Sequence, residues 1–398
     1  NPASSLKFIS NATVTGTGSV LVSTTTAAPG GTAGQYTLTG FGSGNYVVSV
    51  AKTTGQNGIS AADASSTARH AAGVLLLPSS GQRIAADVTN NNAISAGDAA
   101  QIARFSAGLG AGTAFTNQWR FFVPDPGFPT FPIGASPTTR SYTDPIGVQT
   151  AQDFIGILIG EVTGNWAAGP LRPAAGPERS TAVNLPRLVT PADSEVIVPV
   201  SVNGAVNKGI TSYEFDLRYD PAVIQPQAEP VDLAGTVSRG LTAVANANEP
   251  GLLRVVMYGV YPIDSNGLML NLRFNAVGAP GSVSPITFER IMFNEGDPGT
   301  LVTDGQVELS AAAANQAEIS GRLLNSMGQG MPNARVTLTD TTGQSRYVMS
   351  NGFGAYRFGN LQVGQTYTLS VESRNATFTP LTVSVTGQSV NVDMIAGQ

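Results

Sequence analysis

Alternating hydrophobic and polar positions dominate this chain and predict strands along most of its length. Between residues 12 and 50, short alternations of Thr, Val and Tyr are separated by Gly-rich turns, which is typical of half-buried strands. Further along, Tyr213, Phe215, Leu217 and Tyr219 fall on one face of a strand, because side chains alternate across a pleat. The same pattern predicts strands at 196–202, 252–256, 268–274 and 286–293. We therefore expect a mainly β, multidomain fold.

Helical periodicity is concentrated in a region that follows the first strands. Ile102, Phe105 and Leu109 recur at helical spacing, and glycines follow where the helix should end. Residues 58–63 align with residues 93–98, so the same loop and helix are predicted twice. A small helical domain is therefore expected between β regions.

The two ends of the chain carry the same pattern of glycines and aromatic residues. Gly34-Gln-Tyr36 is followed by Phe41, Gly44 and Tyr46, and Gly354-Ala-Tyr356 is followed by Leu361, Gly364 and Tyr367. Such self-similarity indicates a repeated structural module. The C-terminal copy, 317–398, resembles the carboxypeptidase-regulatory-like (transthyretin-like) β-sandwich family, which implies a binding or spacer module without catalysis.

The N-terminal copy, 1–52, aligns with the C-terminal copy from Asn11 onward and leaves no upstream counterpart of 319–323. It is therefore predicted to be a sandwich that lacks one strand. An unpaired strand edge is normally covered, and we consider a strand from another copy of the chain. Two alternatives are that Leu6, Phe8 and Ile9 fold back, or that a neighbouring domain of the same chain covers the edge.

Residues 87–98 place oxygen-bearing groups at the spacing of an EF-hand-type calcium loop. The predicted ligands at positions 1, 3, 5, 7 and 12 are Asp87, Thr89, Asn91, the carbonyl of Ala93, and Asp98. The copy upstream has Lys52, Thr54 and Gln56 at positions 1, 3 and 5. One cation and two neutral groups do not neutralise a dication, so this copy alone is expected to bind Ca²⁺ weakly or not at all.

A third fragment repeats the opening of the calcium loop without its closing half: Glu161, Thr163 and Asn165 match positions 1, 3 and 5. It is predicted to complete the ligand-poor loop with Asp63 as the shared carboxylate, giving a second metal site. The alternative, of equal weight, is that this fragment is only a turn. A duplicated calcium loop followed by a helix, with Asp at position 12, resembles the dockerin family, which implies a calcium-binding helical domain at 53–167.

The later strands carry a second resemblance. Tyr213-x-Phe-x-Leu-x-Tyr219-Asp-Pro221 together with Leu270-x-Leu-x-Phe274 resembles the cohesin family. The resemblance implies a jelly-roll sandwich at 183–310 and dockerin-bearing partners. Two Pro/Ala/Gly-rich or Ala-rich stretches, 168–182 and 311–316, are predicted linkers.

An insertion at 112–146 contains Trp119-Arg-Phe-Phe122 and many prolines. Its aromatic residues are expected to cap the helical core, with carbohydrate stacking as the alternative. A short third helix is predicted at 152–159.

Composition narrows the range of functions. Charged residues make up 12 % of the 398 positions and the net charge is −5, so no basic stripe for nucleic acid is expected. No apolar run is long enough to span a membrane. The chain starts at Asn1 without a signal-like segment, and modest calcium loops suit high external calcium. We therefore expect a mature, processed product or a fragment, secreted to the extracellular space or cell surface of a bacterium.

Catalytic constellations are absent from the sequence. With one histidine, His70, and no cysteine, a Ser-His-Asp triad or a thiolate zinc site is not predicted. Glu214 and Asp216 are expected on the outward face of their strand, and Glu295 and Asp297 in a turn, so no carboxylate pair converges as a glycosidase requires. We expect no enzyme. Asn11 and Asn375 are candidate glycosylation sites.

The leading hypothesis is a non-enzymatic extracellular structural protein, a subunit of a filament or surface assembly. Copies would join by head-to-tail docking, by strand complementation or by both, and Ca²⁺ would order the helical domain. The alternatives are a cohesin/dockerin adaptor, a scaffold that holds surface polysaccharide, or the non-catalytic tail of a larger surface enzyme or adhesin.

Overall fold

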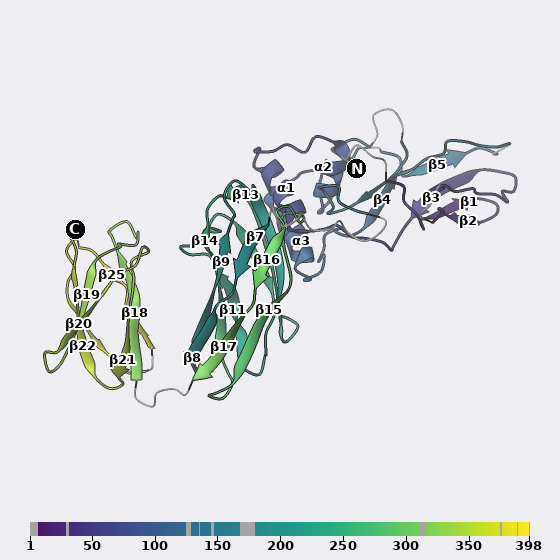
Figure 1. Cartoon of the computed structure of the whole chain (residues 1–398). Coiled ribbons are helices and arrows are strands. Elements are labelled where there is room, and N and C mark those ends of the chain that lie inside the picture. Colours follow the sequence, from purple (N-terminus) through teal and green to yellow (C-terminus); the bar gives the residue numbers. More distant parts are fainter. Residues whose placement is uncertain are drawn as a thin grey trace. The chain divides into compact units, whose positions relative to one another are not determined.

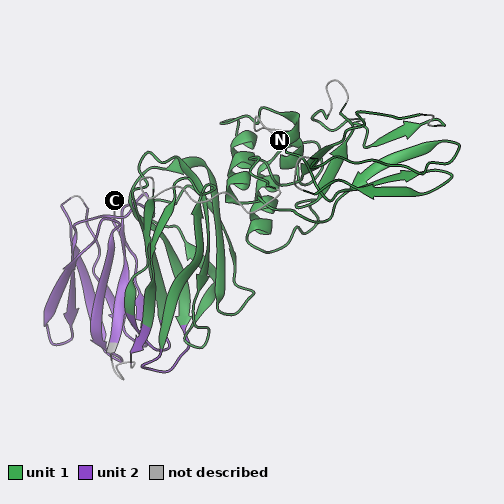
Figure 2. Cartoon of the chain, turned by 45° about the vertical axis from the view of Figure 1, so that its right-hand side comes forward, with its two compact units in different colours: residues 1–188, 195–275, 283–307 green, residues 189–194, 276–282, 308–398 purple. Residues whose placement is uncertain are grey.

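The computed structural model describes residues 7–28, 32–124, 129–134, 136–144, 147–167, 180–310, 316–374, 376–387 and 389–397. Residues 168–179 and 311–315, in the two predicted linkers, lie outside this part of the chain. The fold is mainly β and multidomain, as predicted (Figure 1). Two compact units are distinguished: unit 1 comprises 1–188, 195–275 and 283–307, and unit 2 comprises 189–194, 276–282 and 308–398 (Figure 2).

Unit 1 begins with a four-stranded antiparallel sheet in the order β2-β1-β3-β5. Its strands are β1 (Thr13–Thr17), β2 (Val22–Thr25), β3 (Tyr46–Ala51) and β5 (Thr139–Tyr142). Val14, Tyr46 and Val48 are buried on one face, because side chains alternate along β1 and β3. The strand β5 belongs to the predicted insertion, so residues far along the chain complete the N-terminal sheet.

Three helices follow within the described residues: α1 (Ala61–Ala71), α2 (Ser80–Ala86) and α3 (Ala96–Ser106). Each begins with a capping box in which a serine and the residue three positions later satisfy each other's backbone N–H groups. The pairs are Ser60 with Asp63, Ser79 with Gln82, and Ser95 with Asp98. The helices α1 and α3 match the two predicted repeats, whereas α2 was not predicted.

The predicted third helix at 152–159 is wrong. Residues Ile155–Leu158 form the strand β6, which pairs with β4 (Trp119–Phe122) in an antiparallel ribbon. Gly156 packs so closely against Ile9 and Phe121 that a Cβ there would lie 2.4 Å and 2.8 Å from their side chains. The backbone pairing with the insertion therefore decides the conformation of this short apolar run.

The helical region has a compact core of alanines, β-branched residues and aromatics. Ala64, Ile84, Ile102 and Ala103 are fully buried, and Phe122 of the insertion joins them. Phe115 and Phe131 pack against the same cluster. The insertion thus caps the helical core with aromatic side chains, as predicted.

The jelly roll contains two sheets. The six-stranded sheet has the order β12-β13-β10-β15-β17-β8, and the five-stranded sheet has the order β11-β14-β9-β7-β16. Tyr213, Phe215 and Leu217 are fully buried between the sheets, as the alternation predicts. The strands are β7 (Thr181–Asn184), β8 (Arg187–Pro191), β9 (Glu195–Asn203), β10 (Ile210–Arg218), β11 (Ile224–Asp232), β12 (Thr242–Asn246), β13 (Leu252–Ile263), β14 (Gly267–Ala276), β15 (Val283–Phe293), β16 (Thr300–Thr303) and β17 (Gly305–Ser310).

The C-terminal part of unit 2 is a complete small sandwich. One sheet has the order β21-β18-β24, with β25 also pairing β18, and the other has the order β20-β19-β22-β23. Ile319, Val336, Tyr356 and Leu369 contribute to one buried core. The strands are β18 (Gln316–Leu324), β19 (Arg335–Asp340), β20 (Ser345–Met349), β21 (Ala355–Gln362), β22 (Thr366–Glu372), β23 (Leu381–Ser384), β24 (Ser389–Asn391) and β25 (Met394–Ile395).

Candidate functional site

The residues predicted to form a calcium loop lie around two buried carboxylates. Asp87 and Asp98 are 1 % and 0 % exposed. Both the N–H and the hydroxyl of Thr89 donate to Oδ1 of Asp98, at 3.1 Å and 2.8 Å. The N–H groups of Asn91 and Asn92 donate to the two oxygens of Asp87, at 3.0 Å and 2.8 Å. Positions 1, 3, 5 and 12 of the predicted loop are therefore brought together.

The loop turns sharply at its sixth position. Asn92 has φ +63°, in the left-handed region that few residues adopt. EF-hand loops have a glycine at this position for the same turn, and asparagine is among the residues that tolerate it best. The side chain of Asn92 also accepts a hydrogen bond from the N–H of Ile133 (2.8 Å), which ties the loop to the insertion.

The second predicted site, Asp63 with Glu161, Thr163 and Asn165, is also assembled, from two segments about a hundred positions apart. The N–H and hydroxyl of Thr163 lie 2.9 Å and 3.1 Å from Oδ1 of Asp63. Ser60 contacts Oδ2 of Asp63 through its N–H (2.8 Å) and its hydroxyl (3.2 Å). The N–H of Trp166 donates to Glu161 at 3.3 Å.

These contacts reproduce those of the continuous loop. Thr163 stands to Asp63 as Thr89 stands to Asp98, and Ser60 stands to Asp63 as Ser95 stands to Asp98. The second arrangement is therefore the same loop divided in two, with positions 1–6 at 161–166 and positions 7–12 at 58–63. We call it the split loop.

Two residues hold the halves of the split loop together. The side chain of Asn57 donates to the carbonyl of Ala167 (2.8 Å) and accepts from its N–H (3.1 Å). Gly58 has φ +93°, and a Cβ there would lie 2.1 Å from Oδ1 of Asn165. Only glycine allows this backbone to approach Asn165 so closely.

A carboxylate from the jelly roll, Glu295, lies at the split loop. Its Oε1 accepts from the hydroxyls of Ser60 (3.2 Å) and Thr163. Sequence reasoning placed Glu295 in a turn and gave it no role at the site, because nothing near it in the sequence points to Asp63. Burial raises the pKa of Glu295 to about 7, and the charge of Glu161 adds to the rise.

Asp63 is fully buried beside these acids. Burial raises the pKa of Asp63 well above its usual value, and the charges of Glu295 and Glu161 add to the rise. The N–H groups of Thr163 and Val162 act in the opposite direction, because they stabilise the charged form. The split loop therefore gathers carboxyl groups in a poorly solvated place, where their charged forms are disfavoured.

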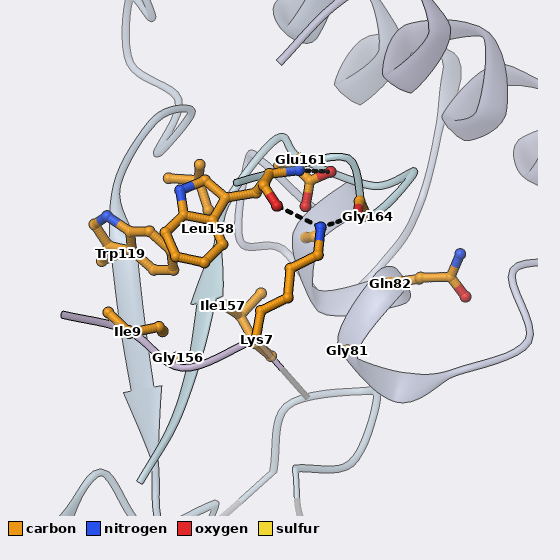
Figure 3. Close-up of a pocket in the computed structure, with 12 residues that line it drawn as sticks. Lys7, Ile9, Gly81, Gln82, Trp119, Gly156, Ile157, Leu158, Glu161 and Gly164 are labelled. Carbon is orange, nitrogen blue, oxygen red and sulfur yellow. Dashed lines mark hydrogen bonds between the residues drawn. The ribbon is translucent and has the colours of Figure 1, made fainter. Parts of the chain in front are cut away.

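A small pocket beside the split loop contains the ammonium group of Lys7. Lys7 donates to the carbonyls of Gly164 (2.6 Å) and Trp166, as Figure 3 shows. Trp119 and Trp166 line the same pocket and pack edge to face, with ring centroids 5.2 Å apart. Trp119 is therefore engaged in packing, which favours the structural interpretation of the insertion over carbohydrate stacking.

The helical region packs against the outer face of the six-stranded sheet of the jelly roll. Val256 and Tyr258 of β13 belong to the same buried cluster as Ala61, Ala64 and Ala107. Small side chains on the helices allow this close approach. The two regions lie side by side in Figure 1, and both belong to unit 1.

Polar contacts fix the register of this interface. Glu214 of β10 accepts from the N–H of Ala61 at the start of α1 (2.9 Å) and from the hydroxyl of Ser106 at the end of α3 (2.9 Å). Ser65 of α1 donates to the carbonyl of Gly259 (2.8 Å). Asn246 of β12 donates to the carbonyl of Ala107 (2.8 Å). A carboxylate at a helix N-terminus is favourable, because it meets unpaired N–H groups and the positive end of the helix dipole.

Glu214 lies on the outward face of β10, as predicted, but that face is covered. Glu214 does point away from the core between the sheets, but it is only 2 % exposed because the helical region covers it. Its other oxygen pairs with Arg290, and Arg290 also approaches Asp216 at 3.6 Å. The pair of carboxylates is part of an interface.

The remaining predicted residues have structural surroundings. His70 accepts a hydrogen bond from the N–H of Leu77 at 2.9 Å, and burial lowers its pKa, with a further contribution from the charge of Arg83. Asn11 is exposed at the start of β1, and Asn375 lies outside the described residues. Among the described residues, no three Asp, Glu, His or Cys side chains converge as metal ligands. No helix described here is long and apolar enough to cross a membrane.

Two domain families match this chain. Residues 181–309 match the Cohesin domain, and residues 318–395 match the Carboxypeptidase regulatory-like domain. The predicted cohesin-like and C-terminal carboxypeptidase-regulatory-like domains are thereby confirmed. Both families are non-catalytic binding or regulatory modules, and the jelly roll matches the first of them. No curated protein matches the chain.

Solved cohesin structures are similar to the jelly roll. The sixth cohesin of Acetivibrio cellulolyticus scaffoldin B, solved in complex with a Cel5 dockerin mutant, has 22% identity and a TM-score of 0.30, over 33% of this chain and 99% of that chain. The seventh ScaB cohesin of Pseudobacteroides cellulosolvens has 20% identity and a TM-score of 0.29, over 34% and 94%. A non-cellulosomal cohesin of Archaeoglobus fulgidus has 17% identity and a TM-score of 0.28, over 33% and 92%. At these values the likeness carries no functional argument.

Proposed function

We propose that this chain is a non-catalytic extracellular structural protein whose copies join into a filament or surface assembly. The observation that carries the proposal is the contact between α1, α3 and the outer face of β10 and β13. One polypeptide contains both halves of this interface. A chain that carries two complementary surfaces can close on itself or join head to tail with its copies.

The N-terminal sheet offers a second means of joining. Residues 36–39 run beside the sheet without a strand partner among the described residues. An extended segment with free backbone groups is suited to receive a strand from another chain. This supports strand complementation as a contribution to the assembly.

Calcium has a place in this proposal at Asp87, Thr89, Asn91, Ala93 and Asp98. Two buried carboxylates, an amide, a hydroxyl and a backbone carbonyl are the oxygen groups that Ca²⁺ prefers. Bound Ca²⁺ would neutralise the two carboxylates and hold the loop that precedes α3. Because α3 contributes to the contact with the jelly roll, the ion would help to order the docking surface.

Docking between copies can be tested with two half-damaged variants. Ser65→Arg damages the helical face and leaves the sheet face intact, whereas Val256→Arg does the reverse. Each variant alone should be monomeric in analytical ultracentrifugation. An equimolar mixture should form a heterodimer, because one intact face of each kind remains. A mixture that stays monomeric, with both variants folded by circular dichroism, contradicts docking between copies.

The cohesin match supports a second candidate, an adaptor that binds dockerin-bearing proteins. Here the helical region would cover the sheet until a partner displaced it. The adaptor predicts that wild-type chain stays monomeric at concentrations at which an assembly subunit would polymerise. Electron microscopy of the concentrated chain distinguishes the two, since only the subunit gives filaments or sheets.

A further inference from the structure

The jelly roll contributes the carboxylate of Glu295 to the split loop. We propose that Asp63, Glu161, Thr163, Asn165 and Glu295 bind a second divalent cation of the oxygen-preferring class, and that Glu295 makes this ion a latch between the helical region and the jelly roll. The inference rests on the proposed docking function and adds a cation that regulates it.

Two hydroxyl groups at the split loop are each shared between two carboxyl groups. The hydroxyls of Ser60 and Thr163 each lie within hydrogen-bond distance of both Asp63 and Glu295. A hydroxyl has one hydrogen and can donate to only one of them. Neither hydroxyl can therefore serve Asp63 and Glu295 at the same time.

One acceptor at the split loop has no donor among the described residues. Oδ1 of Asn165 is buried and has no hydrogen-bond partner among the described residues. Gly58 lets this oxygen sit against the backbone of the other half-loop, where any side chain would displace it. A buried oxygen without a donor is costly unless it is satisfied by something that the protein itself does not supply. A cation supplies that.

The acidic residues of the split loop have no cationic side chain paired with them in the described part of the chain. None of Asp63, Glu161 and Glu295 forms an ion pair with Lys or Arg in the described part of the chain. Lys7 lines the same pocket as Glu161, but its ammonium group donates to the carbonyls of Gly164 and Trp166. Burying a carboxylate without a cation is costly, and a metal ion would remove that cost.

The continuous loop supplies the comparison that identifies the ligand class. The hydrogen bonds of Thr89 and Ser95 to Asp98 recur as those of Thr163 and Ser60 to Asp63, and the residues of the continuous loop are the oxygen ligands of a Ca²⁺ loop. Each loop supplies two carboxylates plus hydroxyl and amide oxygens, and the split loop adds the carboxylate of Glu295 as a third. Glu295 is the group that the continuous loop lacks. Its position on the jelly roll means that one ion would contact both regions.

Calcium binding can be measured by isothermal titration calorimetry on the chelator-treated full chain, with calcium chloride as the titrant. The wild type should bind two ions. Asp98→Asn should lose the ion of the continuous loop, and Asp63→Asn the ion of the split loop. Glu295→Gln should weaken the second ion by about tenfold or more while leaving the first unchanged.

The matched control is Glu289→Gln. Glu289 lies on β15, the strand that ends just before Glu295. Glu289 is exposed and pairs with Arg218 at 2.6 Å, so this variant should bind both ions as the wild type does. A wild type that binds one ion, or a Glu295→Gln variant that titrates like Glu289→Gln, overturns the shared site. Because Glu295 is only half-buried, its variant should fold even if Asp63→Asn does not.

The latch can be measured separately, since the chain has no cysteine. Spin labels at Leu76→Cys and Ile197→Cys, both on exposed side chains, report the distance between the helical region and the jelly roll. With calcium the distance distribution should be narrow, and chelation should broaden it. In Glu295→Gln it should stay broad at calcium levels that saturate the first loop. If the distance distribution of the Glu295→Gln variant narrows at those calcium levels as it does in the wild type, the latch is contradicted.

The two proposals fail in distinguishable ways. If the Ser65→Arg and Val256→Arg variants associate while Glu295→Gln keeps both ions, docking between copies stands and the shared cation site falls. If Glu295→Gln loses the second ion while that mixture stays monomeric, the cation site stands and docking between copies falls.

Discussion

The N-terminal and C-terminal β modules have the same hydrogen-bonding frame but different completeness. Thr26 accepts from the N–H of Ala12 and donates to the carbonyl of Ile9, and Ser350 accepts from Ala334 and donates to Met331. Gly34 and Gly354 close equivalent turns. Beyond those turns the modules diverge, because residues 355–358 pair with β18 and residues 36–39 pair with no described strand.

The sequence shared by the two modules is sufficient for one of the two sheets of such a module. The sheet of β1, β2 and β3 forms as its counterpart β19, β20 and β22 does, because its hydrogen bonds are between near neighbours. The second sheet needs a strand from elsewhere in sequence. The hydroxyl of Tyr36 donates to the carbonyl of Gln152, as that of Tyr356 donates to the carbonyl of Val392.

Hydrogen exchange should show the largest difference between the modules. In the dilute monomer, the amides of residues 36–39 should exchange on the order of a thousandfold faster than those of 356–358, because only the latter are held in a core sheet. Mass spectrometry after deuterium labelling measures both. In assembled material, protection of 36–39 should rise if a strand from a neighbour fills the place. Equal protection of the two segments in the monomer would remove the difference on which the comparison rests.

A second prediction uses two glycines. A Cβ at Gly321 would lie 1.8 Å from the carbonyl oxygen of Val392, whereas at Gly16 it would meet only side-chain carbons of Val22, Phe41 and Leu38 at 2.9–3.2 Å. Gly321→Ala should therefore lower the free energy of unfolding by about 3 kcal/mol, and Gly16→Ala by about 1 kcal/mol. Calorimetry of the full chain measures both, and the reverse order would show that backbone contact does not close the C-terminal module.

A third prediction concerns equivalent core valines. Val336 lies between two sheets, and Val14 lies under a single sheet and the segment that contains Leu38 and Phe41. Val336→Ala should cost about 2 kcal/mol, because a rigid core collapses little around the cavity, and Val14→Ala should cost about half of that. Chemical denaturation gives the values. Equal losses would indicate that the N-terminal core is as closely packed as the C-terminal one.

The smallest difference in stability between the two modules is expected for the hydrogen bonds that both modules contain. Thr26→Ala and Ser350→Ala each leave a buried backbone N–H without its acceptor, and each should cost about 1–2 kcal/mol. Denaturation curves should give the same loss within error. A clear inequality would mean that the shared hydrogen bonds do not carry equal weight in the two modules.

Repeated residues gave the most reliable sequence predictions. The pattern of Gly34 and Tyr36 against Gly354 and Tyr356 anticipated a shared frame, because turns and aromatic anchors are local features. The similarity of 161–165 to 87–91 anticipated that Thr163 would meet a carboxylate, and the structure brings it to Asp63. Calcium at either loop stays a prediction.

The differences between the sequence predictions and the structure have physical causes. Alternation along β10 correctly placed Glu214 opposite the jelly-roll core, but a hydrophobic pattern does not distinguish solvent from a second domain. Residues 155–158 were predicted as helix, because a run this short is compatible with both periods until a partner strand decides. Glu295 was missed because its contacts, Ser60 and Thr163, are remote in sequence. The one feature of the sequence that could have indicated a role for Glu295 is that this acidic residue lies in a turn without a nearby cationic residue.

The division of the split loop has a consequence for the order in which the chain becomes structured. Asp63 leaves the ribosome about a hundred residues before Thr163, and Glu295 follows 132 residues after Thr163. Contacts so distant in sequence form late, since the intervening chain must first be made and ordered. The continuous loop at 87–98 can mature early and alone. Full closure of the split loop therefore reports that the helical region, the insertion and most of the jelly roll have all reached their folded form.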